Sequence, residues 1–290
     1  MSSDPRSFLA IGSRLETAVP ATALLAHLWW YAAAVLYPAR VLKTIGLYPS
    51  NQIGRFPRLV AMKGEGQFYC HQHPEPVFSD RDGTQDRSIE YFDMISTIYA
   101  PSIQVFTRPI FDEALRVMKP ILPSNARILD TSCGPGTETL LLAGVVPDGE
   151  VVGMDLSGGM IRTAAERARR RGVHNVAFFQ ADVANMPEYL GNGFDAAFCF
   201  GAFHHYPDPR GAVRQMYRVL NERGIAFVVD PGPSWFKALS GPIARWGDPG
   251  WVSFYTGEEL EQLFAEAGFR QFFWDELLPG FGFSMAAKYL

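Results

Sequence analysis

The 290-residue sequence predicts an α/β fold in which helices cover both faces of a mainly parallel sheet. Two observations lead to this prediction. Strand-like and helix-like segments alternate from about residue 88 to residue 270, and the strand-like segments are almost continuously apolar. Continuous apolar strands are typical of a parallel sheet that is buried on both faces. A third pattern, two strand-like segments at the end of the chain, adds an antiparallel hairpin at the C-terminal edge of the sheet.

The first 87 residues differ in character and predict a mainly helical N-terminal extension, with an irregular segment, ahead of a domain that spans residues 88–290. Residues 17–39 carry no charged side chain. Three interpretations of this segment stay open: a helix that caps the domain or forms a subunit interface, a shallow contact with a membrane surface through residues 20–38, and a short membrane span. No cleavage site follows it, so a signal peptide is not expected.

The domain is expected to begin with a helical segment over residues 88–118, broken near Pro101 and ended by Pro120. Helix candidates at 157–172 and 209–224 each end on a glycine, which is typical of a helix C-terminus. The final pair of strands should be joined by a turn at residues 279–280. The five strand candidates are residues 126–131, 150–156, 175–182, 194–203 and 225–230.

Composition narrows the class of protein. A formal net charge of −4 gives no basic footprint for nucleic acid. Three cysteines, odd in number and far apart, argue against disulfides and for a reducing compartment, so we expect a cytoplasmic protein. Aromatic residues make up 13% of the chain, which favours an apolar pocket or interface. The expected partner is a small apolar substrate, and a homo-oligomer is compatible with the sequence.

A turn that reads Cys-Gly-Pro-Gly, residues 133–136, follows the first strand of the domain. Open parallel sheets bind ligands at the carboxyl ends of their strands. A dinucleotide site would need a third glycine where this chain has Thr139, and a P-loop would need a lysine after the turn. Residues 128–161 contain five acids and no Lys or Arg. This composition suits a cationic nucleoside without phosphates, and S-adenosyl-L-methionine is such a molecule.

These residues resemble the class I S-adenosylmethionine-dependent methyltransferases, in particular the small-molecule branch that includes the menaquinone and ubiquinone enzymes. The resemblance extends from about residue 91 to the end of the chain. Ser132 departs from it, since glycine is commoner there, and so does LNERG at 220–224, where the family usually has L-K-P-G-G. Five landmarks carry it, in order: ILDTSCGPGT, Asp155, QADVANMP, NGFDAAFCFGAFHHYPDP and AVRQMYRVLNERGIAFVVD. It implies a Rossmann-like sheet and a methyl-transfer reaction.

The resemblance also implies the residues that contact the cofactor. Asp155 is expected to hold the ribose hydroxyls and Asp182 the adenine amine, while Phe92 closes over the cofactor. The plainer alternatives are that Asp130 caps the turn, that Asp155 forms an Asx-turn and that Asp182 is a surface acid. The expected contacts are Asp130, Ser132, Gly134, Gly136, Asp155, Leu156, Met160, Asp182, Val183, Phe200, Gly201 and Tyr99.

Methyl transfer is an in-line displacement, and it needs a base only if the nucleophile carries a proton. His204 and His205 are the candidate catalytic residues, with a purely structural role as the alternative. The strand end also resembles that of the cyclopropane fatty-acid synthases, where G-A-F-E-H places a bicarbonate-holding glutamate at the position of His204. Because this chain has a histidine at that position, the more specific hypothesis is that His204 itself acts as the general base.

The acceptor site is expected in the aromatic segment that follows the last parallel strand, residues 230–260. Its candidate substrate residues are Trp235, Trp246, Trp251 and Phe254, and the alternative is that they belong to an ordinary core. They suit a quinone, polyketide, terpenoid or lipid-like acceptor. No metal site is expected, because the spacing of Cys70, His71 and His73 matches no common zinc pattern.

Two rival functions stay open. One is an S-adenosylmethionine-binding enzyme that catalyses a non-methylating reaction such as a cyclisation. The other is a non-catalytic partner subunit, although the intact Asp130, Gly134, Gly136 and Asp155 argue against it.

Overall fold

The computed structural model describes residues 59–62, 68–71, 84–248, 250–278 and 280–289. The apolar segment at 17–39 lies outside these residues, so its three interpretations stay predictions. Within the described ranges no helix has the length and apolar character needed to cross a membrane. The division of the chain at residue 88 stays a prediction.

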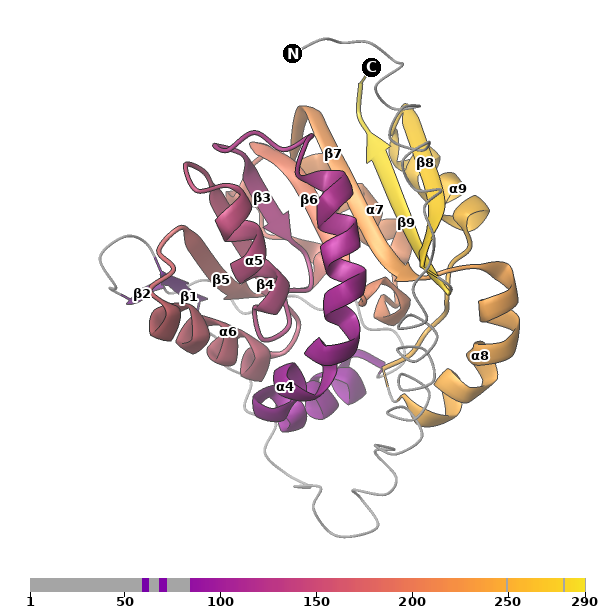
Figure 1. The fold of residues 1–290 in the computed structure, drawn as a ribbon, viewed down its shortest axis with the longest axis horizontal. Coiled ribbons are helices and arrows are strands. Elements are labelled where there is room, and N and C mark those ends of the chain that lie inside the picture. Colours follow the sequence, from indigo (N-terminus) through magenta and orange to yellow (C-terminus); the bar gives the residue numbers. More distant parts are fainter. Residues whose placement is uncertain (1–58, 63–67, 72–83, 249, 279, 290) are drawn as a thin grey trace, which may run out of the picture.

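A single nine-stranded sheet forms the centre of the molecule (Figure 1), with the strand order β2-β1-β5-β4-β3-β6-β7-β9-β8. The strands from β5 to β7 in this order run parallel, as predicted. They are β3 (Arg127–Asp130), β4 (Glu150–Asp155), β5 (Val176–Gln180), β6 (Phe194–Phe200) and β7 (Leu220–Pro231). The predicted C-terminal hairpin is confirmed: β8 (Gln271–Leu278) and β9 (Phe281–Ala287) are antiparallel, and β9 pairs with β7.

Helices cover both faces of this sheet, and each face has its own apolar core (Figure 1). One core joins the sheet to α4 (Thr84–Met118), α5 (Thr137–Val145) and α6 (Gly158–Arg171). The other joins it to α7 (Pro209–Val219) and α9 (Gly257–Ala267). A further helix, α8 (Ser234–Gly247), packs around a small aromatic cluster of its own.

The ends of α6 illustrate how local sequence sets these boundaries. The Ser157 hydroxyl accepts a hydrogen bond from Met160 N at 3.0 Å and so caps the first turn. Gly172 ends the helix with φ 64°, a left-handed conformation that glycine adopts without strain. Both ends lie where the sequence predicts them.

Four elements differ from what the sequence predicts. The helix over 88–118 is not broken at Pro101; α4 continues through it and changes direction along its length (Figure 1). The helix predicted to reach Gly224 ends at Val219, because Leu220 turns into the sheet and pairs with Phe194. Residues 234–247, where no helix was predicted, form α8 despite Pro242.

The fourth difference lies at the other edge of the sheet. Two short strands that the sequence did not indicate, β1 (Leu59–Met62) and β2 (Phe68–His71), form an antiparallel pair. β1 extends the sheet by pairing with β5 through Val60 and Phe178.

The strand order places a ligand site at one particular edge. From β3 the sheet continues to β4 and β5 on one side and to β6 and β7 on the other. The reversal between β3 and β6 opens a crevice beyond the carboxyl ends of the strands. The residues that follow these strand ends should therefore form the functional site.

Candidate active site

A cleft lies at this reversal point and holds about 1210 Å³, including the volume at its open mouth. Of the predicted cofactor residues, it is lined by Ser132, Gly134, Asp155, Leu156, Met160, Asp182, Val183, Phe200 and Gly201. Both candidate catalytic residues, His204 and His205, line it as well.

The glycine turn and the end of β4 are joined by the carboxylate of Asp155. Its two oxygens accept hydrogen bonds from Gly134 N at 2.9 Å and from Ser157 N at 2.8 Å. Burial raises the pKa of Asp155 to about 6, although these backbone donors oppose the shift. The carboxylate is thus fixed at the edge of the cleft, in the place where a ribose acceptor is expected.

Two predicted contacts, Asp130 and Gly136, do not line the cleft. The Asp130 carboxylate is buried and accepts a hydrogen bond from Thr139 Oγ1 at 2.6 Å, so it ties the end of β3 to the start of α5. Gly136 has φ 77°, and a Cβ there would lie 2.8 Å from Cβ of Ala164 in α6. Both residues shape the turn and do not face the ligand space.

The first turns of α4 close one side of the cleft. Gln85 Nε2 donates to Asp182 Oδ2 at 3.0 Å, and Ala184 N donates to Asp182 Oδ1 at 2.9 Å. Asp93 Oδ1 accepts from Ser157 Oγ and, at 2.7 Å, from Gly159 N. These contacts fix α4 against the loops after β4 and β5. Gln85, Ser88, Ile89 and Phe92 consequently line the cleft from this side.

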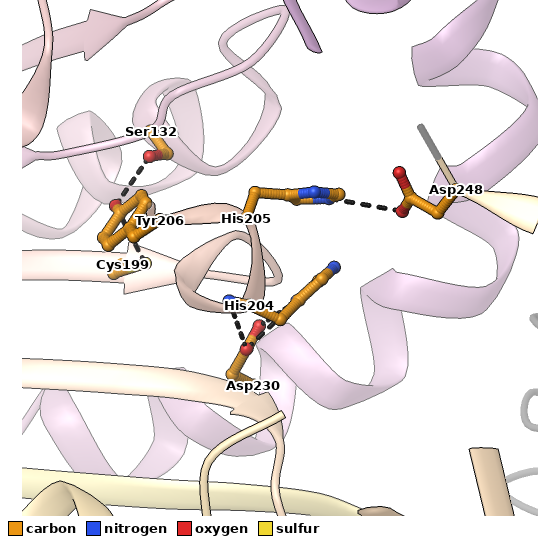
Figure 2. A network of polar contacts seen from close by, with 7 residues as sticks. All are labelled: Ser132, Cys199, His204, His205, Tyr206, Asp230 and Asp248. Atoms are coloured by element: carbon orange, nitrogen blue, oxygen red, sulfur yellow. Dashed lines mark hydrogen bonds and ion pairs between the residues drawn. The ribbon is translucent and has the colours of Figure 1, made fainter. Parts of the chain in front are cut away.

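At the end of the cleft beyond β6, the 3-10 helix η3 (Phe203–His205) carries both histidines. His204 is buried, and its Nδ1 lies 2.9 Å and 3.0 Å from the two carboxylate oxygens of Asp230 at the end of β7 (Figure 2). Burial disfavours the imidazolium, but the attraction of Asp230 outweighs it, so the pKa of His204 is raised. The carboxylate thus orients the ring and makes it more basic.

The neighbouring His205 has a different partner, the carboxylate of Asp248 just after α8. Their Nε2 and Oδ2 atoms are 3.5 Å apart (Figure 2). The ring of Phe92 packs edge-on against His205, with the ring centres 5.3 Å apart. Burial lowers the pKa of His205, and Asp248 only partly offsets this. The two histidines therefore differ in charge preference although their ring centres are 4.1 Å apart.

Tyr206 forms a polar contact that sequence reasoning missed. Its hydroxyl is 2.7 Å from Ser132 Oγ and 3.3 Å from Cys199 Sγ (Figure 2). This contact ties the loop after β6 to the glycine turn. Cys133 in that turn is buried, and burial raises the pKa of its thiol well above the usual range, so it is a packing residue and not a nucleophile.

The aromatic residues expected at the acceptor site do not line the cleft in the described structure. Trp235 on α8 is 48% exposed. Phe254 is fully buried with its ring 5.5 Å from that of His204, and Trp251 packs on Phe254. Phe254 therefore packs against η3 through His204, and Trp251 packs on Phe254 in turn. The side chains of Tyr99 and Trp246 lie outside what the structure describes.

The electrostatic character of the cleft suits a cation. Asp155, Asp182 and Glu138 line it, and none of the described lining residues is Lys or Arg. S-adenosyl-L-methionine carries a sulfonium and an ammonium group and no phosphate, so these lining carboxylates fit it. Asp155 and Asp182 would hold the nucleoside, and the sulfonium methyl would lie toward Phe200 and Gly201.

A parallel sheet with a C-terminal antiparallel hairpin and an acidic cleft beside a glycine turn defines the class I methyltransferase fold. Residues 122–268, just over half of the chain, match the family model described as "Methyltransferase domain". The chain belongs to this family, and its cofactor is S-adenosyl-L-methionine.

Three similar proteins illustrate the range of the family. Over 186 residues the chain is 24% identical to a demethylmenaquinone methyltransferase of Listeria welshimeri, covering 62% of this chain and 76% of the relative. The DhpI–SAH complex is 20% identical with a TM-score of 0.56, covering 71% of this chain and 98% of DhpI. The [4+2]-cyclase SpnF is 20% identical with a TM-score of 0.55, covering 74% of this chain and 99% of SpnF. The two structures show the shared fold.

Proposed function

We propose that the chain transfers the methyl group of S-adenosyl-L-methionine to a small apolar acceptor that binds beside His204. The observation that carries this proposal is the buried Asp230–His204 pair, in which His204 lines the cleft just beyond β6. It places an oriented imidazole at the end where the sulfonium methyl is expected.

The reaction at this site is an in-line displacement. The acceptor atom attacks the methyl carbon, the carbon–sulfur bond breaks, and neutral S-adenosylhomocysteine leaves without needing an acid. A hydroxyl acceptor must lose its proton as it attacks, and His204 would take that proton on Nε2, because Nδ1 is held by Asp230. Asp230 acts here as a positioning residue.

An apolar acceptor is supported by the walls around the histidines. Phe92, Phe200, Pro231 and Phe281 line this part of the cleft and offer no charge to a bound molecule. The relative named for demethylmenaquinone, which is an apolar quinone, supports the same class of acceptor. The aromatic residues 235 and 251 have no part in this version of the acceptor site.

The test is an incubation of the purified protein with methyl-labelled cofactor and a panel of apolar hydroxylated acceptors, including naphthoquinols. Label should appear in a product that is one methylene unit heavier. His204→Ala should lower the rate by about 10²–10⁴-fold while the Kd for S-adenosylhomocysteine stays the same. A loss below about threefold would remove His204 from the role of base. A product of unchanged mass would instead indicate a non-methylating reaction.

A further inference from the structure

Two imidazoles and a carboxylate meet at the reacting end of the cleft. The donor atoms of His204, His205 and Asp248 all lie within 4.8 Å of one another. Figure 2 shows the two rings and the Asp248 carboxylate around a common space. The histidines come from η3 and the aspartate from the end of α8, so tertiary packing brings the three together.

The surroundings of these side chains hold them in place for a shared ligand. Asp230 binds Nδ1 of His204, and the other edge of the ring points toward the space between His205 and Asp248 (Figure 2). A carboxylate behind an imidazole is the usual support of a metal-binding histidine, because it fixes the ring and strengthens the other nitrogen as a donor.

The loop after α8 is fixed in the same way. Val252 N and Ser253 N donate to the carbonyl oxygen of His204 at 2.9 Å and 3.2 Å, which joins this loop to η3. Gly250 N donates to Asp248 Oδ1 at 2.9 Å, and Asp248 Oδ2 is the oxygen near His205. Ligand atoms of a tetrahedral zinc ion are about 3.4 Å apart. The His205 and Asp248 atoms already lie near this separation, and the longest separation would have to shorten by up to about 1.4 Å to complete the geometry.

The donor set selects the kind of ion. Two imidazole nitrogens and one carboxylate oxygen suit zinc and its neighbours, whereas magnesium and calcium prefer oxygen ligands alone. Two neutral imidazoles with Asp230 and Asp248 carry a charge of −2, which a divalent ion would balance. We propose that His204, His205 and Asp248 bind one divalent transition-metal ion, with Zn²⁺ as the best match.

The consequence for catalysis rests on the proposed function above. An ion on Nε2 of His204 occupies the lone pair that the general base needs. Bound zinc should therefore inhibit methyl transfer to a hydroxyl acceptor, and the site would make the enzyme sensitive to free transition metal.

Binding is tested without any activity by titrating the metal-free protein with Co²⁺ and recording its visible absorption. One ion per chain should give intense bands of low-coordinate cobalt, which Zn²⁺ should abolish by displacement. Asp248→Ala and His205→Ala should each raise the Kd for the ion at least about tenfold. Unchanged binding of S-adenosylhomocysteine shows that these variants are folded.

Two controls separate this site from other histidines. A variant with His71→Ala and His73→Ala, and a second with His174→Ala, should keep the cobalt spectrum of the wild type. If the spectrum is absent in the wild type, or survives Asp248→Ala, the site is overturned.

The ratio of methyl-transfer rates with and without Zn²⁺ tests the consequence. It should fall well below one in the wild type and return toward one in Asp248→Ala. Binding without inhibition, or stimulation by zinc, would overturn the inhibitory role and also remove His204 as the base. If no acceptor is methylated under any condition, the proposed function fails while the cobalt titration still decides the metal site.

Discussion

Three carboxylates of the site differ in role because they differ in contacts. Asp155 accepts hydrogen bonds from two backbone N–H groups at the edge of the cleft. Asp230 contacts the backbone N–H and the imidazole of His204. The buried Asp130 accepts a hydrogen bond from the hydroxyl of Thr139. Of these three, only Asp155 lines the cleft. Their positions at the ends of β4, β7 and β3 are alike, so the roles follow from their neighbours and not from residue type.

Asp155→Ala tests the ribose contact. Removing an ionised acceptor should weaken binding of S-adenosylhomocysteine by about 2 kcal/mol, or some thirtyfold in Kd, measured by calorimetry. Asp148→Ala, which removes an exposed carboxylate beyond α5, is the matched control and should bind normally. If both variants bind like the wild type, Asp155 does not hold the cofactor.

Asp230→Asn tests the positioning of His204. The amide keeps the shape of the side chain but loses the charge that orients the imidazole, so kcat should fall by about 10²-fold with cofactor affinity unchanged. A merely structural effect would lower the rate further when the variant is combined with His204→Ala. We expect no further loss in the double variant, because the two residues act as one unit.

At the scale of elements, the cleft is built from strand ends, a glycine turn and the first turns of α4. The turn can approach α6 only because residue 136 lacks a side chain. Residue 134 has a positive φ of 51° as well, but open space surrounds it. Glycine is therefore required for backbone conformation at both positions and for space at only one of them.

This difference predicts unequal costs for two alanine substitutions. Gly134→Ala should lower the free energy of unfolding by about 1–2 kcal/mol, the cost of a left-handed backbone. Gly136→Ala should add about 1–3 kcal/mol for the clash with Ala164. Gly144→Ala in α5, where a Cβ meets nothing within 4 Å, should be neutral or stabilising. Urea denaturation measures all three, and equal losses at 134 and 136 would contradict the packing argument.

How far the sequence predicts these elements depends on how local their causes are. The strands from β3 to β6 lie within three residues of the prediction at either end, because continuous apolar runs and flanking turn residues are local signals. The end of α7 was wrong, since Leu220 leaves the helix to pair with Phe194 across the sheet. α8 was missed because its prolines and glycines resemble a loop.

The same distinction applies to the site. Asp155 and Asp182 lie at the carboxyl ends of predicted strands, so their place at the cleft could be predicted. Asp230 ends the last parallel strand and carried the same signal, which went unused. Gln85 reaches the cleft, and Asp248 reaches His205, only through tertiary packing, and no spacing in the sequence indicates either contact. Phe254, predicted at the acceptor site, is fully buried against His204 and is not among the residues that line the cleft.

At the scale of the whole molecule, the protein buries the carboxyl groups of Asp130 and Asp155 near the cleft, and this burial couples its stability to pH. Burial raises the pKa of Asp130 to about 7 and that of Asp155 to about 6. In the unfolded chain such groups titrate near about 3.9. Between these values the folded protein binds more protons than the unfolded chain, so the contribution of these acids to stability falls as pH rises from about 4 to about 7.

Asp130→Asn isolates one part of this dependence. The amide cannot ionise and can still accept the hydrogen bond from Thr139, so the variant avoids the cost of a buried charge above pH 7. Its free energy of unfolding relative to the wild type should therefore rise between pH 5 and pH 8, as measured by urea denaturation without cofactor. Glu258→Gln, on the exposed first turn of α9, should show no such change. A difference between Asp130→Asn and the wild type that stays constant with pH would show that Asp130 is already ionised in the folded protein at pH 5.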